Sequence, residues 1–204
     1  ILEQDCDIEP ILGDTEAGRY ILRHSCAHLL AQAVVEIYPD AQPTIGPPIE
    51  NGFYYDFKMD PVGDGDLKKI EKKMQEHIRA NHTLTREEHD NRTLRDMFAG
   101  NPFKIEIMND KIGMDIGSSA YRQGDFVDLC LGPHVPSTSY LRWFKLTGTS
   151  QAYWKGDSSK DSLVRIYGMC FSSKDELRER ERQIEEAKKR DHKKIGKELS
   201  LIHI

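Results

Sequence analysis

Two pairs of side chains that can bind protons or metal ions stand far apart in the sequence. His24 and His28 have the i, i+4 spacing that puts both imidazoles on one face of a helix. Cys130 and His134 flank the turn sequence Leu-Gly-Pro, which can fold so that a thiol and an imidazole face the same point. If the fold brings the two pairs together, they form a site of three imidazoles and one thiol.

Two chemistries suit such a site. Three histidines and one cysteine are good zinc ligands, and two pairs from separate elements can complete a tetrahedron. The same side chains could instead hold a water molecule without metal, with a histidine as the general base. Asp128 stands two residues before Cys130, which places it on the same side of a strand. A third interpretation is that the histidines are unrelated, because an i, i+4 pair also arises by chance.

The first half of the chain predicts the element that carries the histidine pair. Residues 16–38 predict a helix that ends at Pro39, with a wide apolar face formed by Ile21, Leu22, Leu29, Leu30, Val34, Val35 and Ile37. Residues 39–52 predict a shaped loop, because each Pro fixes φ and each Gly frees it. The aromatic run of residues 52–57 predicts a strand.

The middle of the chain predicts shorter elements. Residues 66–80 predict a second amphipathic helix, and residues 91–99 a short one. Asn101 followed by Pro102 is typical of a helix start. Residues 103–108 also alternate apolar with polar side chains, which suits a strand equally well, so both interpretations stay open there.

The last third predicts strands followed by a long helix. Strands are expected over residues 124–130, 144–147 and 162–167. At the other end of the chain, residues 8–12 are strand-like as well. Ser173 and Glu176 form a capping box that starts a charged helix running to about Leu199. The patterns predict an α+β fold: an antiparallel sheet with the HxxxH helix packed on it, a small α/β insertion over 58–118, and a long C-terminal helix that acts as a solvated connector.

Composition is that of a soluble globular protein. The 204 residues carry a net charge of −5, with 31% charged and 38% hydrophobic residues, and the mild acidity argues against a protein that coats nucleic acid regardless of sequence. We find no uninterrupted apolar stretch that would span a membrane and no signal peptide, so we expect no membrane partner. The cysteines are far apart without a CxxC motif, which favours reduced thiols in the cytoplasm, at Cys6, Cys26, Cys130 and Cys170.

Several segments, in order, resemble the editing domain of the threonyl-tRNA synthetases, the domain type shared with alanyl-tRNA synthetase. Residues 23–30 and 128–136 resemble its two signatures, and residues 45–56 resemble its Pro-Gly loop and aromatic strand. Residues 147–156 and 165–168 match further blocks. Residues 188–197 resemble the linker helix that enters the catalytic domain.

The resemblance implies an activity and the residues for it. The synthetase attaches serine by mistake, and the editing domain hydrolyses the resulting seryl-tRNA. By resemblance the catalytic positions are His24, His28, Lys104, Asp128, Cys130 and His134, and Tyr55 matches an aromatic that binds substrate. Three further aromatics are interpreted as packing residues of the core or the sheet, with stacking on the terminal adenosine as the alternative: Trp143, Tyr153 and Trp154.

The resemblance also implies cofactors and partners. No cofactor is expected for editing, but zinc held by His24, His28, Cys130 and His134 stays open, because the related alanyl-tRNA editing proteins bind zinc with the same arrangement. ATP and another zinc would belong to an aminoacylation domain whose motifs this sequence lacks. The expected partner is the acceptor end of tRNA(Thr) carrying serine. A full-length protein would be a homodimer through domains outside this sequence.

The expected domain organisation follows from the same matches. Residues 1–15 would be the tail of a preceding module, residues 16–172 the editing domain, and residues 173–204 the linker helix. Two other functions are retained: a free-standing zinc-dependent deacylase of the alanyl type, and a zinc-stabilised tRNA-binding module without activity. The connector helix argues against the first, and the second predicts folding that depends on metal.

Overall fold

The computed structural model describes residues 9–110 and 119–190 of the chain. The larger sheet is antiparallel, with strand order β1-β3-β8-β7 and β2 paired to β3. Its strands are β1 (Gln42–Pro43), β2 (Pro48–Ile49), β3 (Gly52–Lys58), β7 (Trp143–Tyr153) and β8 (Ser162–Phe171). A smaller antiparallel sheet has the order β4-β5-β6, formed by β4 (Leu84–Glu88), β5 (Ser119–Gln123) and β6 (Phe126–Leu129).

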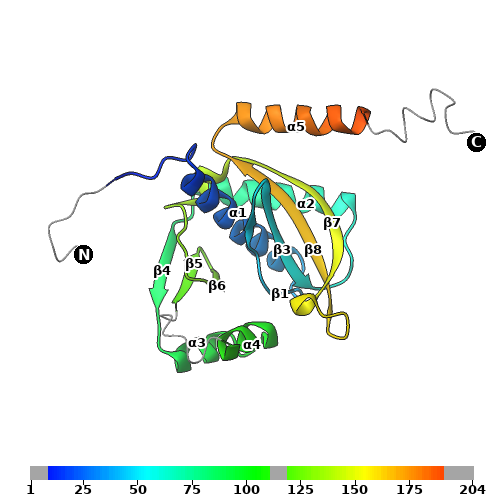
Figure 1. Ribbon diagram of the computed structural model, residues 1–204. Coiled ribbons are helices and arrows are strands. Elements are labelled where there is room, and N and C mark those ends of the chain that lie inside the picture. The colour runs from blue at the N-terminus through cyan, green and yellow to red at the C-terminus, as the bar shows by residue number, and fades with distance from the viewer. Residues whose placement is uncertain (1–8, 111–118, 191–204) are drawn as a thin grey trace, which may run out of the picture.

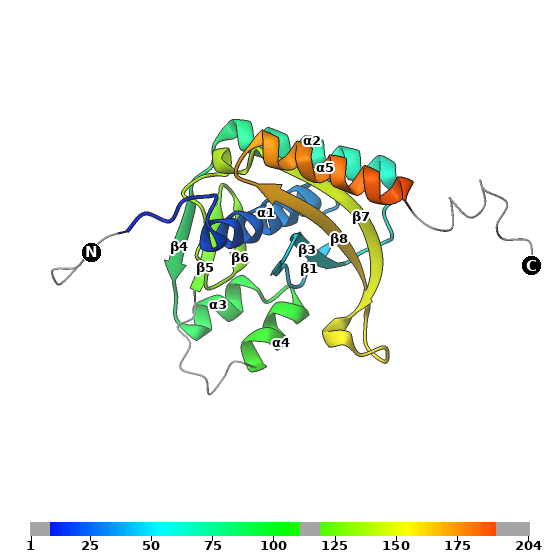
Figure 2. The same ribbon diagram turned by 45° about the horizontal axis from the view of Figure 1, so that its top comes forward.

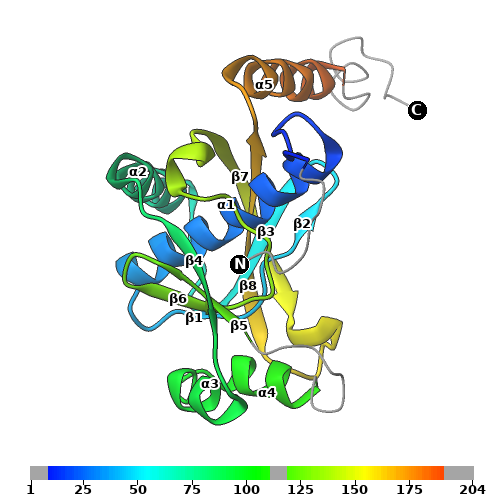
Figure 3. The same ribbon diagram turned by 90° about the vertical axis from the view of Figure 1, so that its left-hand side faces the viewer.

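Helix α1 (Glu16–Ile37) lies between the two sheets, as Figures 1 and 3 show. Thr15 caps its start by accepting a hydrogen bond from the backbone N–H of Gly18. Leu29, Leu30 and Val34 are fully buried in the main core together with Phe53 and Phe57 of β3. This packing fixes the face of α1 that carries the histidine pair.

Four other helices of the described residues surround these layers: α2 (Asp64–Ala80), α3 (Asn91–Met97), α4 (Pro102–Asp110) and α5 (Lys174–Lys189). Helix α2 places Leu67, Ile70 and Met74 in the main core beside α1. Helices α3 and α4 lie at one end of the small sheet, whereas α5 lies over the far end of β7 and β8 and buries none of its residues (Figures 1 and 2). Two short 3₁₀ turns lie before and after β7: η1 (Thr138–Leu141) and η2 (Trp154–Gly156).

The predicted α+β class with antiparallel sheets is confirmed, and most predicted elements are present. The open segment 103–108 is helical within α4, because the Asn101 side chain accepts hydrogen bonds from the N–H groups of Phe103 and Lys104. The predicted strand over residues 8–12 is wrong for the part that is described. Residues 9–12 join no sheet, and the side chains of Ile11 and Leu12 are exposed.

Other differences come from weak local signals. Strands β4 and β5 were not predicted, because their sequences are short and mostly polar. The C-terminal helix is confirmed over α5, and its expected continuation to residue 199 lies outside the described residues. None of the described helices is long and apolar enough to cross a lipid bilayer.

The Pro-Gly loop packs directly on an aromatic side chain of β3. A Cβ atom added to Gly46 would lie 2.1 Å from Cδ2 of Tyr55, and Tyr55 is 1% exposed. A Cβ atom at that distance would overlap the ring. The loop therefore reaches its place over β3 only with glycine at this position.

We predict that Gly46→Ala lowers the free energy of unfolding by roughly 1–3 kcal/mol, because the ring or the loop must move. Urea denaturation measures this change. Gly65→Ala is the matched control, since nothing lies within 4 Å of the added Cβ and the site is in α2, where alanine should stabilise by up to about 1 kcal/mol. Equal stability of Gly46→Ala and the wild type would contradict the close packing on Tyr55.

Candidate functional site

The fold brings the two distant pairs of side chains to one point. α1 supplies His24 and His28, and the loop after β6 supplies Cys130 and His134. Cys130 Sγ lies 3.4 Å from His24 Nε2 and 3.2 Å from His134 Nε2. One ligand atom from each residue lies within 4.8 Å of the others. We call these four residues the His/Cys cluster.

The imidazoles of the cluster pack against one another. The ring centroid of His134 is 4.3 Å from that of His24 and 4.2 Å from that of His28. Tyr121 of β5 covers another side of the His134 ring at 4.4 Å. The His134 ring is therefore held on several sides.

The turn between Cys130 and His134 has little freedom. Gly132 has φ 74°, which favours glycine, and an added Cβ would lie 2.1 Å from the hydroxyl oxygen of Tyr121. The backbone N–H of Gly132 also donates a hydrogen bond to Cys130 Sγ at 3.2 Å. This turn aims the thiol and the imidazole at α1.

Ser25 is a residue of the site that the sequence analysis did not identify. Its buried Oγ accepts a hydrogen bond from the Val135 N–H at 3.0 Å and lies 3.0 Å from His134 Nδ1. That contact at Nδ1 leaves Nε2 of His134 pointing to Cys130. The only signal in the sequence was a small polar residue between His24 and Cys26, which becomes informative only once the loop is known to touch α1.

A second group of predicted site residues lies beside the cluster. Asp128 of β6 accepts hydrogen bonds from Lys104 Nζ at 2.5 Å and from the Tyr55 hydroxyl at 2.6 Å. Lys104 also donates to the Tyr55 oxygen at 3.0 Å. All three are buried, and His28 Nε2 is 3.8 Å from Asp128. The structure thus brings all seven predicted residues together, while their catalytic and binding roles stay predictions.

Burial sets the protonation of the cluster. Desolvation holds the pKa of His28 well below its usual value, and the charge of Lys104 and the neighbouring His24 act in the same direction. Desolvation also lowers the pKa values of His24 and His134. The imidazoles are therefore neutral near pH 7, and a neutral ring has one nitrogen that can accept a hydrogen bond or bind a metal ion. Burial and the nearby Asp128 raise the pKa of Tyr55, which keeps its phenol protonated as a donor.

The donor set of the cluster can hold a metal ion. Neutral imidazoles and a thiol that deprotonates on binding are ligands that zinc prefers, and their separation suits one shared ion. The same neutral imidazoles can instead hold a water molecule and take its proton. The geometry is compatible with both chemistries that the sequence leaves open.

The remaining candidates lie away from the cluster. Trp154 is 3% exposed and donates its indole N–H to Glu106 at 2.8 Å, so it packs in the core, and the stacking alternative does not hold for it. Trp143 lies under the ammonium group of Lys174 at 5.9 Å. Cys26 and Cys170 are buried free thiols, and Cys6 lies outside the described residues.

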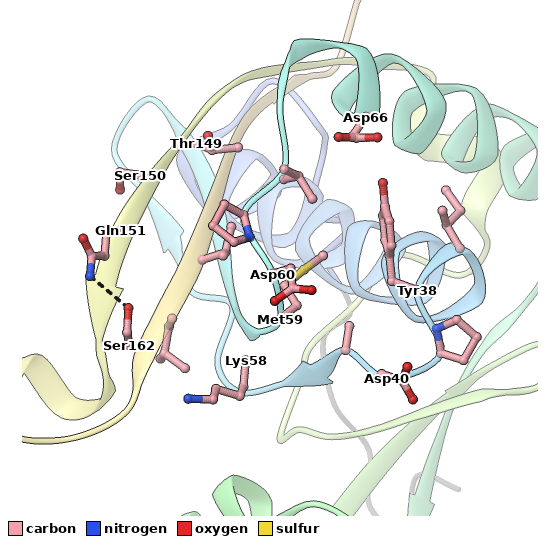
Figure 4. A pocket seen from close by; sticks show the side chains of 17 residues that line it. Tyr38, Asp40, Lys58, Met59, Asp60, Asp66, Thr149, Ser150, Gln151 and Ser162 are labelled. Carbon is pink, nitrogen blue, oxygen red and sulfur yellow. Dashed lines mark hydrogen bonds between the residues drawn. The ribbon is translucent and has the colours of Figure 1, made fainter.

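A cavity of about 940 Å³ lies at the C-terminal end of α1 (Figure 4). It is lined by the end of α1, the segment between β3 and α2, and parts of β7 and β8. Carboxylates face it from Asp40, Asp60 and Asp66. It includes no residue of the cluster.

Comparison with known proteins places this geometry in context. The sequence profile of the family described as "Threonyl and Alanyl tRNA synthetase second additional domain" matches residues 119–167. The chain is 49% identical over 201 residues to the threonine–tRNA ligase of Thermoplasma volcanium, covering 98% of this chain and 30% of that protein. It is 45% identical over 206 residues to that of Francisella philomiragia, covering 100% and 32%. The chain thus spans about a third of the length of the curated relatives it matches.

We predict that Lys104→Met lowers the free energy of unfolding by about 3–5 kcal/mol, because it leaves the Asp128 carboxylate buried without its cation. Adding Asp128→Asn to Lys104→Met should recover a large part of the loss, since the amide carries no charge. Chemical denaturation measures the free energy of unfolding of both variants and of Asp128→Asn alone, which completes a double-mutant cycle. No recovery in the double variant would count against the buried ion pair.

Proposed function

We propose that the chain is part of a threonyl-tRNA synthetase, as its similarity to threonine–tRNA ligases and to the second additional domain over residues 119–167 supports, and that the His/Cys cluster hydrolyses the ester bond of seryl-tRNA(Thr). One observation carries the proposal: three neutral imidazoles and a thiol surround one point beside a buried network of Lys104, Asp128 and Tyr55. This arrangement suits a bound water and an ester carbonyl.

The need for such a site follows from the similarity of serine and threonine. Serine lacks only the methyl group of threonine, and a difference of that size is worth about 1–3 kcal/mol in binding, or roughly 10–200-fold in discrimination. A single pocket therefore cannot reject serine well enough. A second pocket that admits serine, excludes the threonine methyl group and hydrolyses what it admits completes a double sieve.

We assign the chemical steps as follows. A histidine of the cluster takes a proton from water, whose oxygen forms a bond to the ester carbonyl carbon. The bond from that carbon to the ribose oxygen then breaks, and the protonated histidine returns the proton to that oxygen. The products are serine and tRNA with a free ribose hydroxyl. Ser25 holds the His134 ring in the orientation that these transfers need.

The Lys104–Asp128 pair would stabilise the negative charge that develops on the carbonyl oxygen of the ester. The Lys104 ammonium group is paired with Asp128, whose carboxylate lies 3.8 Å from His28 Nε2, and it can stabilise the oxyanion or hold the ribose. The carboxylate oxygens of Asp128 already accept from Lys104, Tyr55 and its neighbouring backbone N–H. This favours a role for Asp128 in orienting Lys104 and Tyr55 over direct contact with the substrate.

Metal and partners complete the proposal. If zinc binds, His24, His28, Cys130 and His134 would hold it, and it would supply a Lewis acid that lowers the pKa of bound water. We propose that the reaction proceeds without it. The partner is the acceptor end of tRNA(Thr) carrying serine, and the full-length protein is a cytoplasmic homodimer whose other domains hold ATP.

The domain organisation also stays a proposal. Residues 16–172 form the editing domain, preceded by the tail at 1–15 and followed by the linker helix of 173–204. Within the proposed insertion of 58–118, α2 shares the main core with α1, whereas α3 packs with the small sheet. The insertion is thus joined to the rest of the domain through α2.

We predict that the isolated chain deacylates seryl-tRNA(Thr) and spares threonyl-tRNA(Thr), measured by release of labelled amino acid. His24→Ala combined with Cys130→Ala should reduce the rate at least about 100-fold, because it removes groups that hold the water and transfer its proton. His89→Ala is the matched control, since His89 contacts Glu87 outside the cluster. Wild-type rates in the double variant would refute the site.

We predict that protein stripped with a chelator retains its seryl-tRNA deacylase activity. The reason is that the neutral imidazoles can hold water by hydrogen bonds alone. Metal content by mass spectrometry is measured on the same sample. Loss of activity on chelation, with recovery on adding zinc, would establish the metal-dependent alternative instead.

A further inference from the structure

One exposed aromatic ring lies at the outer end of the His/Cys cluster. Tyr20 follows the same face of α1 as His24 and His28, at steps of four residues. Its ring centroid is 6.1 Å from that of His24, and the residue is 51% exposed. Tyr121, which also contacts the cluster, is 9% exposed. Among the described residues in ring contact with the cluster, Tyr20 is thus the tyrosine that is exposed to solvent.

Exposure increases along this face of the helix. His28 is 4% exposed and lies beside Asp128, His24 is half-buried, and Tyr20 is half exposed. Each step of four residues rises about 6 Å, so Tyr20 is about 12 Å from His28 along the axis. A ligand in this site would place its small end at the buried histidines and a larger end at Tyr20.

Two exposed apolar side chains and one cation belong to segments in contact with this part of α1. Ile49 and Leu131 are each more than 40% exposed, and Leu131 directly follows Cys130. Arg23 stands three residues after Tyr20 and donates a hydrogen bond to the backbone oxygen of Ile49 at 3.2 Å. Exposed apolar groups beside a guanidinium suit a flat base that is joined to a phosphate.

We propose that Tyr20 stacks on the adenine of the terminal nucleotide while the ester on its ribose lies among the imidazoles. This inference rests on the proposed deacylase function and names the base-binding subsite of that pocket. The rise of about 6 Å between His24 and Tyr20 is comparable with the ribose that separates ester and base. Stacking needs only a π face, so Tyr20 holds the base without reading its edges.

Two non-hydrolysable compounds test the proposal by calorimetric binding. The first is adenosine with serine joined to the ribose by an amide, and the second is the same seryl-amide on ribose without the base. Tyr20→Ala should weaken binding of the first compound by about 5- to 150-fold and leave the second unchanged. Tyr20→Phe should bind both as the wild type does, because the ring is kept.

A spectroscopic readout separates stacking from a general structural effect. With 2-aminopurine in place of adenine in the first compound, binding should quench its fluorescence in the wild type and in Tyr20→Phe. Tyr20→Leu, which keeps apolar area but no π face, should bind with little quenching. Tyr140→Ala is the control, since Tyr140 is 57% exposed on η1 and should behave as the wild type.

The outcomes distinguish this proposal from the one it rests on. If the wild type binds neither compound, both the stacking and the editing function are overturned. If the wild type binds the first compound and Tyr20→Ala binds it equally well, only the stacking is overturned. The same holds if Tyr20→Ala weakens both compounds equally, because the base would then make no difference.

Discussion

The site depends on the burial of α1 between two antiparallel sheets. Burial is continuous from Ser25 to Val34, so both apolar and polar faces of this stretch are removed from water. Its polar side chains must then find partners in the small sheet and the loop that follows it. Ser25 contacts His134, Gln32 accepts from Gln123 at 2.6 Å, and His28 lies beside Asp128. The cost of leaving such groups unpaired fixes the position of α1 against the small sheet, and with it the cluster.

The buried ion pair of Lys104 and Asp128 affects both the stability of the fold and the protonation of the site. Lys104 comes from α4, Asp128 from β6 and Tyr55 from β3, so their network joins elements of both sheets. The same desolvation that makes an unpaired charge costly there keeps the neighbouring imidazoles neutral. A site of neutral bases beside a paired cation is thus a consequence of how the core closes, and it matches what hydrolysis of an ester requires.

The functions that we propose for residues along α1 follow how deeply each residue is buried. The network at Asp128 is buried, the cluster is partly exposed, and Tyr20 is half exposed. Such a gradient suits a substrate whose small amino acid is recognised in a closed space and whose nucleotide stays at the surface. The fold supplies both because one straight helix carries residues from the core to the edge of the sheets (Figure 3).

The sequence by itself determined the helices with strong periodicity, the antiparallel α+β class and the two pairs His24/His28 and Cys130/His134, because local spacing and turn chemistry act within a few residues. Resemblance added Lys104, Asp128 and Tyr55. Only the tertiary structure decided that Trp154 is buried and that Ser25 contacts His134. Both depend on residues distant in the chain, Ser25 with His134 and Trp154 with Glu106, which no local pattern encodes. The helix over residues 103–108 has a local cap at Asn101, but the alternating apolar pattern there suited a strand equally well.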